Sequence, residues 1–134
     1  MKPAYLLDTN IVSQLLRGPS AADQHLLKMQ RDSWGISAVT RGELSFGIAL
    51  RPEAVRLRQK VSAFLDTCHT WPWDSEAADW FGRIRADLRQ QGQSIGYADE
   101  MIAAHALALG CILVTDNVRH FQRVAGLRVE NWLS

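Results

Sequence analysis

Four carboxylates stand in the sequence where an amphipathic pattern does not account for an acid. Asp8 directly follows the apolar run "AYLL", Asp116 directly follows "CILVT", Glu43 lies shortly after "WGIS", and Asp99 opens "DEMIAAHALAL". Carboxylates that are brought together repel one another unless a cation lies between them. Oxygen ligands select hard cations such as Mg²⁺ or Mn²⁺. If the four acids converge, they indicate metal-dependent hydrolysis of a phosphodiester.

Each acid also has an ordinary structural interpretation. Asp8 is a good N-cap for a following helix, and Asp99 would stabilise the first turn of its own helix. Glu43 fits a solvated helix face, and Asp116 fits a simple "TDN" turn because Asp and Asn both favour turns. Taken singly, each acid fits either interpretation. Only their shared placement near strand ends and helix starts favours a metal site.

The elements that must position these acids alternate between short apolar runs and helical patterns. The sequence predicts strands at 4–7, 34–37 and 111–115, a strand or turn at 69–73, an edge strand at 127–132, and helices at 10–17, 20–30, 38–50, 52–68, 75–92 and 97–110, with a short segment from 117 to 124 left unassigned. In the helix at 52–68, Pro52 stands near the start, a position that proline tolerates. Short buried strands separated by helices indicate a parallel sheet covered on both faces. Ligands bind such sheets at the edge where the strands end, and the acids follow strands there.

Composition and length bound the class of protein. The chain has 134 residues, of which 47% are apolar and 22% charged, which is typical of a globular protein. We therefore expect one domain over residues 1–134. The net charge of +1 gives no overall basic field. Two distant cysteines, and the lack of an apolar stretch long enough for a signal peptide or a membrane span, lead us to expect a cytoplasmic protein without membrane contact.

Four segments carry a resemblance to a known family. They are "LLDTNIVSQLLRG" near the start, "ISAVTRGELSFGI" at 36–48, "QGQSIGYADEMIAAHALALGCILVTDNVRHF" at 91–121 and "GLRVENW" at 126–132. Together they resemble the PIN-domain family, and within it the VapC toxins of VapBC toxin–antitoxin pairs. The resemblance implies a PIN-like three-layer α/β/α sandwich with a central, mainly parallel sheet of four to five strands.

The resemblance also implies an activity and a site. It implies an endoribonuclease that depends on Mg²⁺, with Mn²⁺ as a substitute, and that leaves a 3′-hydroxyl and a 5′-phosphate. Asp8, Glu43 and Asp99 match the catalytic, metal-binding acids of the family. Asp116 is the candidate for the fourth, although the usual "T-x-D" spacing falls on Asn117, and position 120, acidic in some relatives, is His120.

Supporting residues and partners complete these expectations. Thr9 and Thr115, with Asn117 as a further candidate, are expected to hydrogen-bond around the acids, and Asn10 to cap or brace its loop. Arg41, Arg85 and Arg119 are candidates for RNA phosphate contacts, and His105 is expected to be a packed core residue.

The implied substrate is RNA, namely transfer RNA and within it the initiator species. The implied partners are a VapB antitoxin lying across the active site and a second copy in a homodimer, with higher-order toxin–antitoxin assembly and operator DNA bound only through the antitoxin. The amphipathic segments 20–30 and 52–68 offer apolar faces for these contacts.

Overall fold

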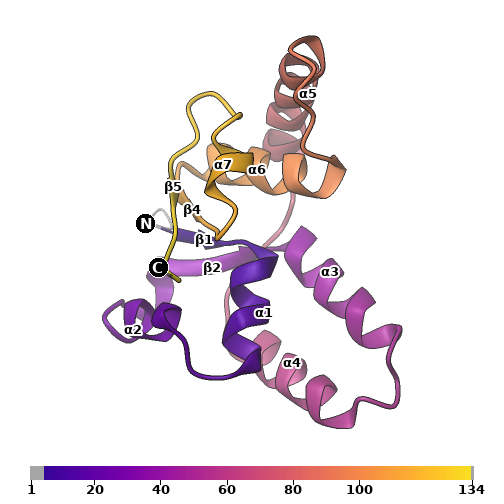
Figure 1. The fold of residues 1–134 in the computed structure, drawn as a ribbon, viewed down its shortest axis with the longest axis vertical. Helices are drawn as coiled ribbons and strands as arrows, with labels where there is room; N and C mark the ends of the chain where they lie inside the picture. The colour runs from indigo at the N-terminus through magenta and orange to yellow at the C-terminus, as the bar shows by residue number, and fades with distance from the viewer. Residues whose placement is uncertain (1–4, 134) are drawn as a thin grey trace.

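The structure, a computed structural model, describes residues 5–133 as a parallel sheet with helices on both sides (Figure 1). The strands are β1 (Tyr5–Leu7), β2 (Trp34–Ser37), β3 (Thr70–Trp71), β4 (Ile112–Val114) and β5 (Val129–Glu130). The helices are α1 (Thr9–Arg17), α2 (Ala21–Leu27), α3 (Ala38–Ala49), α4 (Val55–Thr67), α5 (Ser75–Gln90), α6 (Tyr97–Leu109) and α7 (Val118–Phe121), with one 3₁₀ turn at Arg31–Ser33. This confirms the predicted fold class.

The order of the strands creates a crevice at one edge of the sheet. The order is β3-β2-β1-β4-β5, and all four pairings are parallel. The chain moves from β1 outward through β2 to β3, then returns to place β4 on the other side of β1. The direction of winding therefore reverses between β1 and β4. Ligands bind in such folds outside the carboxyl ends of the strands at this point of reversal.

Two apolar cores cover the two faces of the sheet. Neighbouring residues of a strand point to opposite faces, and β1 shows this directly. Leu6 packs with residues of α5, α6 and α7, whereas Leu7 packs with residues of α1, α3 and α4, and both leucines are fully buried. Figure 1 shows the same division, with α5–α7 on one side of the sheet and α1–α4 on the other. None of the helices formed by residues 5–133 has the length and apolarity of a bilayer-spanning segment.

The starts of three helices place the candidate acids near the strand ends. Asp8 is the N-cap of α1, and its carboxylate accepts a hydrogen bond from the Thr9 amide. Ser37 ends β2 and caps α3, where its hydroxyl accepts from the Val39 amide at 3.0 Å. Gly96, at a φ of 95°, turns the chain into α6 in a conformation that favours glycine. Asp99 then falls in the first turn of α6.

Several predicted boundaries differ from the structure. The first predicted strand began at Ala4, which lies outside the described residues. The helix predicted at 20–30 ends at Leu27, because the Lys28 amide bonds to the His25 carbonyl and closes a tighter turn. The placement of Pro52 near a helix start was wrong. It belongs to a connecting turn, closed by the Ala54 amide on the Arg51 carbonyl, and α4 begins only at Val55.

The remaining ambiguities are also resolved. The segment at 69–73 contains a real strand, since β3 pairs with β2 through Ile36 and Thr70. The short segment after β4 forms α7. The predicted edge strand at 127–132 is reduced to the two residues of β5.

Gly35 supplies a test of this packing. A Cβ at Gly35 would clash with the Trp71 ring and lie 2.7 Å from the His69 carbonyl oxygen, so β2 and β3 would have to separate. We expect Gly35→Ala to lower the free energy of unfolding by about 1–3 kcal/mol, the usual cost of overpacking. Gly82→Ala, in the open middle of α5, should instead raise it by up to about 1 kcal/mol. Urea denaturation of both variants measures the difference, and equal effects would contradict the close approach of the two strands.

Candidate active site

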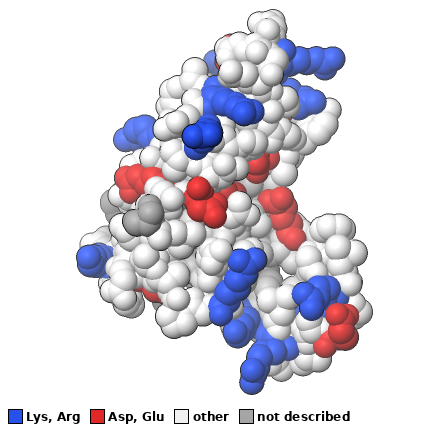
Figure 2. Space-filling model, in the orientation of Figure 1, with Lys and Arg blue, Asp and Glu red and all other residues white. Residues whose placement is uncertain are grey.

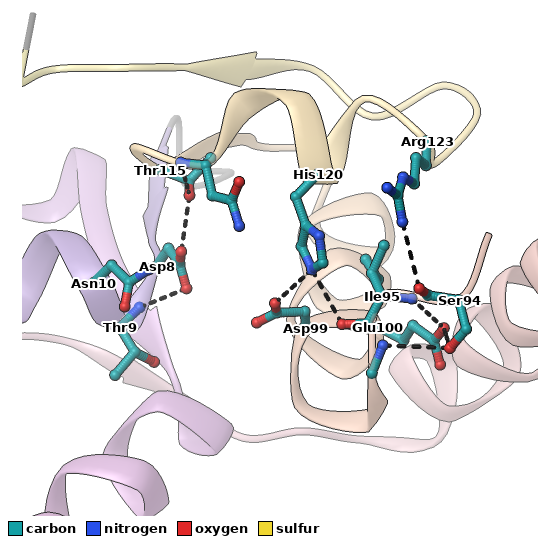
Figure 3. A network of polar contacts seen from close by, with 12 residues as sticks. Asp8, Thr9, Asn10, Ser94, Ile95, Asp99, Glu100, Thr115, His120 and Arg123 are labelled. Atoms are coloured by element: carbon teal, nitrogen blue, oxygen red, sulfur yellow. Dashed lines mark hydrogen bonds and ion pairs between the residues drawn. The ribbon is translucent and has the colours of Figure 1, made fainter.

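Asp8 lies at the crevice where the winding of the sheet reverses. It follows β1, and its own amide continues the sheet by donating to the Val114 carbonyl of β4 at 2.9 Å. One carboxylate oxygen, Oδ1, accepts from the Thr9 amide at 2.7 Å. The other, Oδ2, accepts from the Thr115 hydroxyl at 2.8 Å. The carboxylate is thus fixed between the ends of two neighbouring strands (Figure 3).

The environment of Asp8 disfavours its negative charge. Asp8 is only 3% exposed, and burial raises its pKa to about 6, an effect that the negative charges of Asp99 and Glu43 increase. The hydrogen bonds from Thr115 and Thr9 act in the opposite direction and lower the pKa without cancelling the shift. Among residues 5–133, no Lys, Arg or His side chain forms an ion pair with Asp8. A cation from outside the chain would relieve this unfavourable charge.

Asp99 faces Asp8 from the first turn of α6. In Figure 3 the two carboxylates point toward one another across the crevice. Asp99 Oδ2 lies 3.0 Å from Nε2 of His120, which comes from α7. Burial raises the pKa of Asp99, and the neighbouring His120 partly offsets this by favouring the charged carboxylate.

Glu43 is connected to this site through Thr9. The Thr9 hydroxyl donates to Glu43 Oε1 at 2.6 Å and lies 3.0 Å from the hydroxyl of Thr40. Thr9 is the residue next to Asp8, and Thr40 and Glu43 are one turn apart on α3. Both threonines therefore hydrogen-bond to acids of the site, Thr9 to Glu43 and Thr115 to Asp8.

Asp116 lies at the outer edge of the same crevice. It is exposed, and its Oδ1 accepts from the Asn10 side-chain amide at 3.4 Å. This contact links the first turn of α1 to the turn after β4. Asn117 is the N-cap of α7, and its backbone amide donates to the Thr115 hydroxyl at 3.0 Å. Asp116 thus reaches the site from the end of β4, the strand beside β1. Asn117 contributes only its backbone amide, which bonds to Thr115.

The four acids gather at one edge without closing around a common point. In the described part of the chain, no three Asp, Glu, His or Cys side chains are close enough together to hold one ion as they stand. Thr9 holds the carboxylate of Glu43, and His120 holds that of Asp99. The donors are nevertheless all carboxylate oxygens around a buried, uncompensated acid, and this chemistry fits a hard divalent cation.

A groove of about 470 Å³ runs from the site between α1, α3 and α4. Thr9 and Glu43 line it, and so do Arg17 and Arg51. All three helices contribute apolar side chains to its wall, namely Leu16, Leu44, Ile48, Leu57 and Val61. Phe46, Leu50 and Val55, close in sequence to these residues, are more than half exposed. The groove is therefore suited to an amphipathic segment of a partner.

The arginines predicted to contact RNA have different environments. Arg85 donates to the buried carboxylate of Glu100, and its guanidinium lies 3.7 Å from the centre of the Tyr97 ring. Arg41 is exposed and lies 3.3 Å from the Thr70 hydroxyl. Arg119 is exposed on α7. Figure 2 shows acidic side chains across the middle of this face, with Lys and Arg over the parts of the molecule on either side of them.

Two histidines differ in their relation to the site. His105 is a packed core residue, as predicted: it is 1% exposed and its Nδ1 lies 2.8 Å from the Ser37 hydroxyl. Burial lowers its pKa, so the neutral ring is favoured. His120 belongs to the site itself, because it contacts Asp99.

Sequence reasoning missed Thr40 and Glu100. Glu100 is fully buried beside Asp99, and its carboxylate accepts from Arg85, from the Ser94 hydroxyl and from the Ile95 amide. A signal for this was present, since Glu100 shares a helical stripe with the buried Ala103 and Ala104. For Thr40 the only signal was its position three residues before Glu43.

Comparison with known proteins identifies the family. The PIN-domain family model matches residues 5–127. The tRNA(fMet)-specific endonuclease VapC of Shigella flexneri is 36% identical over 128 residues, which cover 96% of this chain and 97% of that protein. This chain belongs to the PIN-domain family. Another VapC-named relative, ribonuclease VapC2 of Haemophilus influenzae (strain Rd), is 35% identical over 96% of this chain and 98% of its own length.

Solved PIN-domain structures share the fold over nearly the whole chain. The DNA-bound VapBC of Salmonella typhimurium contains a chain that superimposes with a TM-score of 0.90 at 31% identity and covers 97% of this chain and 98% of that one. VapBC2 of Rickettsia felis, bound to a promoter DNA fragment, gives 0.89 at 30% identity, over 96% and 98% of the two chains. The likeness to these structures therefore extends over nearly the whole of this PIN domain.

The raised pKa of Asp8 gives a pH-dependent stability with a defined sign. The folded protein holds this proton more tightly than the unfolded chain does, so stability falls as pH rises through the interval between the two pKa values. With EDTA present, we expect the free energy of unfolding of wild type, relative to Asp8→Asn, to fall by about 2 kcal/mol between about pH 4 and pH 7.

The comparison with Asp8→Asn isolates one group, because other titrating residues, His105 among them, are common to both proteins. Asn preserves the size of the side chain and can still cap α1. Chemical denaturation at a series of pH values measures the difference. A difference that does not change with pH would show that the carboxylate of Asp8 is not held in an unfavourable environment.

Proposed function

We propose that this protein is the ribonuclease toxin of a VapBC toxin–antitoxin pair, acting in the cytoplasm as one domain over residues 1–134. The observation that carries the proposal is the buried Asp8 carboxylate facing Asp99 at the crevice of a PIN-domain sheet. Relatives that cover nearly the whole chain are named tRNA(fMet)-specific endonuclease or ribonuclease. The two free cysteines are compatible with a reducing compartment.

The cofactor in this proposal is Mg²⁺, with Mn²⁺ as a substitute. Asp8, Glu43 and Asp99 would hold it, and Asp116 would complete the set from the outer edge of the crevice. When bound, such an ion polarises the phosphate and lowers the pKa of water, which is the chemistry that phosphodiester hydrolysis needs. The charge of the ion would also offset the burial of Asp8, and the repulsion from Asp99 and Glu43, which together raise its pKa.

The protein's own residues hold the acids for this role. Thr115 and the Thr9 amide fix the two oxygens of Asp8, and the Thr9 hydroxyl holds Glu43. These bonds use one lone pair of each oxygen and leave others available. Hydrogen bonds of this kind fix the orientation of acidic ligands and strengthen metal sites.

The substrate in this proposal is transfer RNA, and specifically the initiator species. Its phosphates would lie along the basic regions on either side of the acidic centre (Figure 2). Arg119 and Arg41 remain candidates for these contacts. Arg85 is a weaker candidate, because the buried Glu100 already binds its guanidinium.

Partners follow from the groove and the comparisons. The solved relatives from Salmonella typhimurium and Rickettsia felis are VapBC complexes bound to DNA. A VapB antitoxin would place an amphipathic segment in the groove between α1, α3 and α4 and so cover the acids. Operator DNA would be reached only through this antitoxin. The exposed Leu27 of α2 and Val55 of α4 support the apolar contacts of a homodimer, from which larger toxin–antitoxin assemblies would be built.

Removing one acid should separate catalysis from RNA binding. We expect Asp8→Asn and Asp99→Asn each to lower the rate of tRNA cleavage in Mg²⁺ at least about 100-fold, since metal-assisted charge stabilisation is worth several kcal/mol. EDTA should have the same effect on wild type. Sequencing the fragment ends identifies the tRNA and the cleaved bond. Asp79→Asn, an exposed acid of α5, is the control and should cleave normally.

Cleavage that survives both EDTA and the Asp99→Asn substitution would refute the proposed activity. If wild type binds tRNA but never cleaves it, the protein is a binding scaffold instead. In the same assay, a loss in Asp116→Asn equal to that in Asp8→Asn would assign the fourth position to Asp116.

A second test fills the groove. The Cβ position at Gly47 is open, so Gly47→Phe would project an aromatic ring into the groove without meeting neighbours at its base. We expect VapB binding to weaken about 5- to 150-fold, the equivalent of a packing clash of about 1–3 kcal/mol. Gly42→Phe, equally open on α3 but outside the groove, is the matched control. Calorimetry with the cognate VapB measures both. Unchanged affinity in Gly47→Phe would place the antitoxin elsewhere.

A further inference from the structure

One ring nitrogen of His120, Nε2, contacts two hydrogen-bond acceptors. This nitrogen lies 3.0 Å from Asp99 Oδ2 and 3.1 Å from the carbonyl oxygen of Ile95 (Figure 3). A carbonyl oxygen and an ionised carboxylate both lack a proton to donate. The hydrogen must therefore be on Nε2, where the two acceptors share it. His120 thus joins α7 to the loop before α6 and to Asp99 at once.

The Ile95 end of this arrangement is firmly held. The Ile95 side chain is buried, and its amide donates to Glu100 Oε2 at 3.2 Å. The Ser94 hydroxyl donates to the same oxygen, and Arg85 donates to the other. Both backbone groups of Ile95 are therefore bonded, one to Glu100 and one to His120. This gives the imidazole a fixed anchor that does not depend on Asp99.

Asp99 depends on His120 more than Asp8 depends on any one partner. Asp8 has a hydrogen-bond donor for each carboxylate oxygen, the Thr9 amide and the Thr115 hydroxyl. Within residues 5–133, the Asp99 carboxylate accepts a hydrogen bond only from His120, through Oδ2. Rotation of the Asp99 side chain is thus restrained from one side, and Oδ1 is left for another ligand.

We propose that His120 is a positioning residue, whose Nε2–H, anchored on Ile95, holds the Asp99 carboxylate toward Asp8 for binding of the divalent cation. The inference rests on the proposed function, because it presupposes that Asp99 is a ligand. It assigns to His120 no direct contact with the ion. The role requires a hydrogen-bond donor at the Nε2 position and does not require an imidazole ring.

Two substitutions distinguish a donor at that position from the ring itself. The amide nitrogen of Gln reaches close to where Nε2 lies, whereas that of Asn corresponds to Nδ1 and stops short of Asp99. We expect His120→Asn to weaken Mn²⁺ binding about 10- to 100-fold, the usual effect of losing a hydrogen bond to a metal ligand. His120→Gln should keep an affinity close to that of wild type.

The experiment titrates purified, metal-stripped protein with Mn²⁺ and follows free Mn²⁺ by electron paramagnetic resonance, so that its readout is independent of RNA cleavage. Arg123→Gln is the matched control, because Arg123 contacts the same loop through the Ser94 carbonyl without touching Asp99. Thermal unfolding in EDTA checks that each variant is folded. At saturating Mn²⁺, cleavage kinetics should show a lower kcat for His120→Asn with the KM for tRNA unchanged.

The outcomes separate this inference from the proposed function. If His120→Asn is folded and binds Mn²⁺ as tightly as wild type, the positioning role is wrong even though the nuclease stands. If His120→Gln loses as much affinity as His120→Asn, the ring itself is required and the positioning role is again wrong. If wild type takes up no Mn²⁺, the proposed metal-dependent function fails, and the inference fails with it.

Discussion

The structure depends on one buried carboxylate. Asp8 ends β1 in the middle of the sheet, where it is removed from solvent and has no cationic side chain as an ion-pair partner within residues 5–133. Burying a charge without such compensation is costly. Hydrogen bonds from Thr9 and Thr115 offset part of this cost. The remaining cost is why the pKa of Asp8 stays raised. An external cation accounts for a carboxylate kept in this position.

The topology of the sheet explains how distant acids reach Asp8. Because β4 returns to the free side of β1, Thr115 comes to lie against a residue more than a hundred positions earlier. The same return leaves a crevice at the strand ends, into which the first turn of α6 carries Asp99. The hydrogen bonds of Thr9 and His120 then orient the acids from outside the crevice. Each acid is therefore positioned by an element other than its own.

Some of this arrangement could be predicted from the sequence, because it is local. Asp8 after a buried strand, and Asp99 in the first turn of a helix, follow from residue types and short-range patterns. The alternation of short buried strands and helices predicted the parallel sheet and placed the acids at one edge of it. The family resemblance added the assignment of these acids as metal ligands. That Thr9 and Thr115 lie near the acids could also be predicted, since both adjoin acids at strand ends, but their hydroxyls bond to more distant acids, Glu43 and Asp8.

Other features depend on how elements pack and leave no local trace. The bond between His120 and Asp99 requires the orientation of α7, a four-residue helix that the sequence did not define. The bond between Arg85 and Glu100 left no local trace for a similar reason, because it depends on the burial of Glu100. Pro52 was placed near a helix start although it lies inside the turn before α4, since proline suits both positions. In each case a tertiary contact selects among locally acceptable alternatives.

The most direct test of the account is to locate Mn²⁺ in crystals of the protein by its anomalous scattering. The account predicts a peak in the crevice between β1 and β4, bonded to carboxylate oxygens of Asp8 and Asp99, with Glu43 turned toward it. A fully occupied Mn²⁺ elsewhere on the molecule, with the Asp8–Asp99 crevice empty, would contradict it.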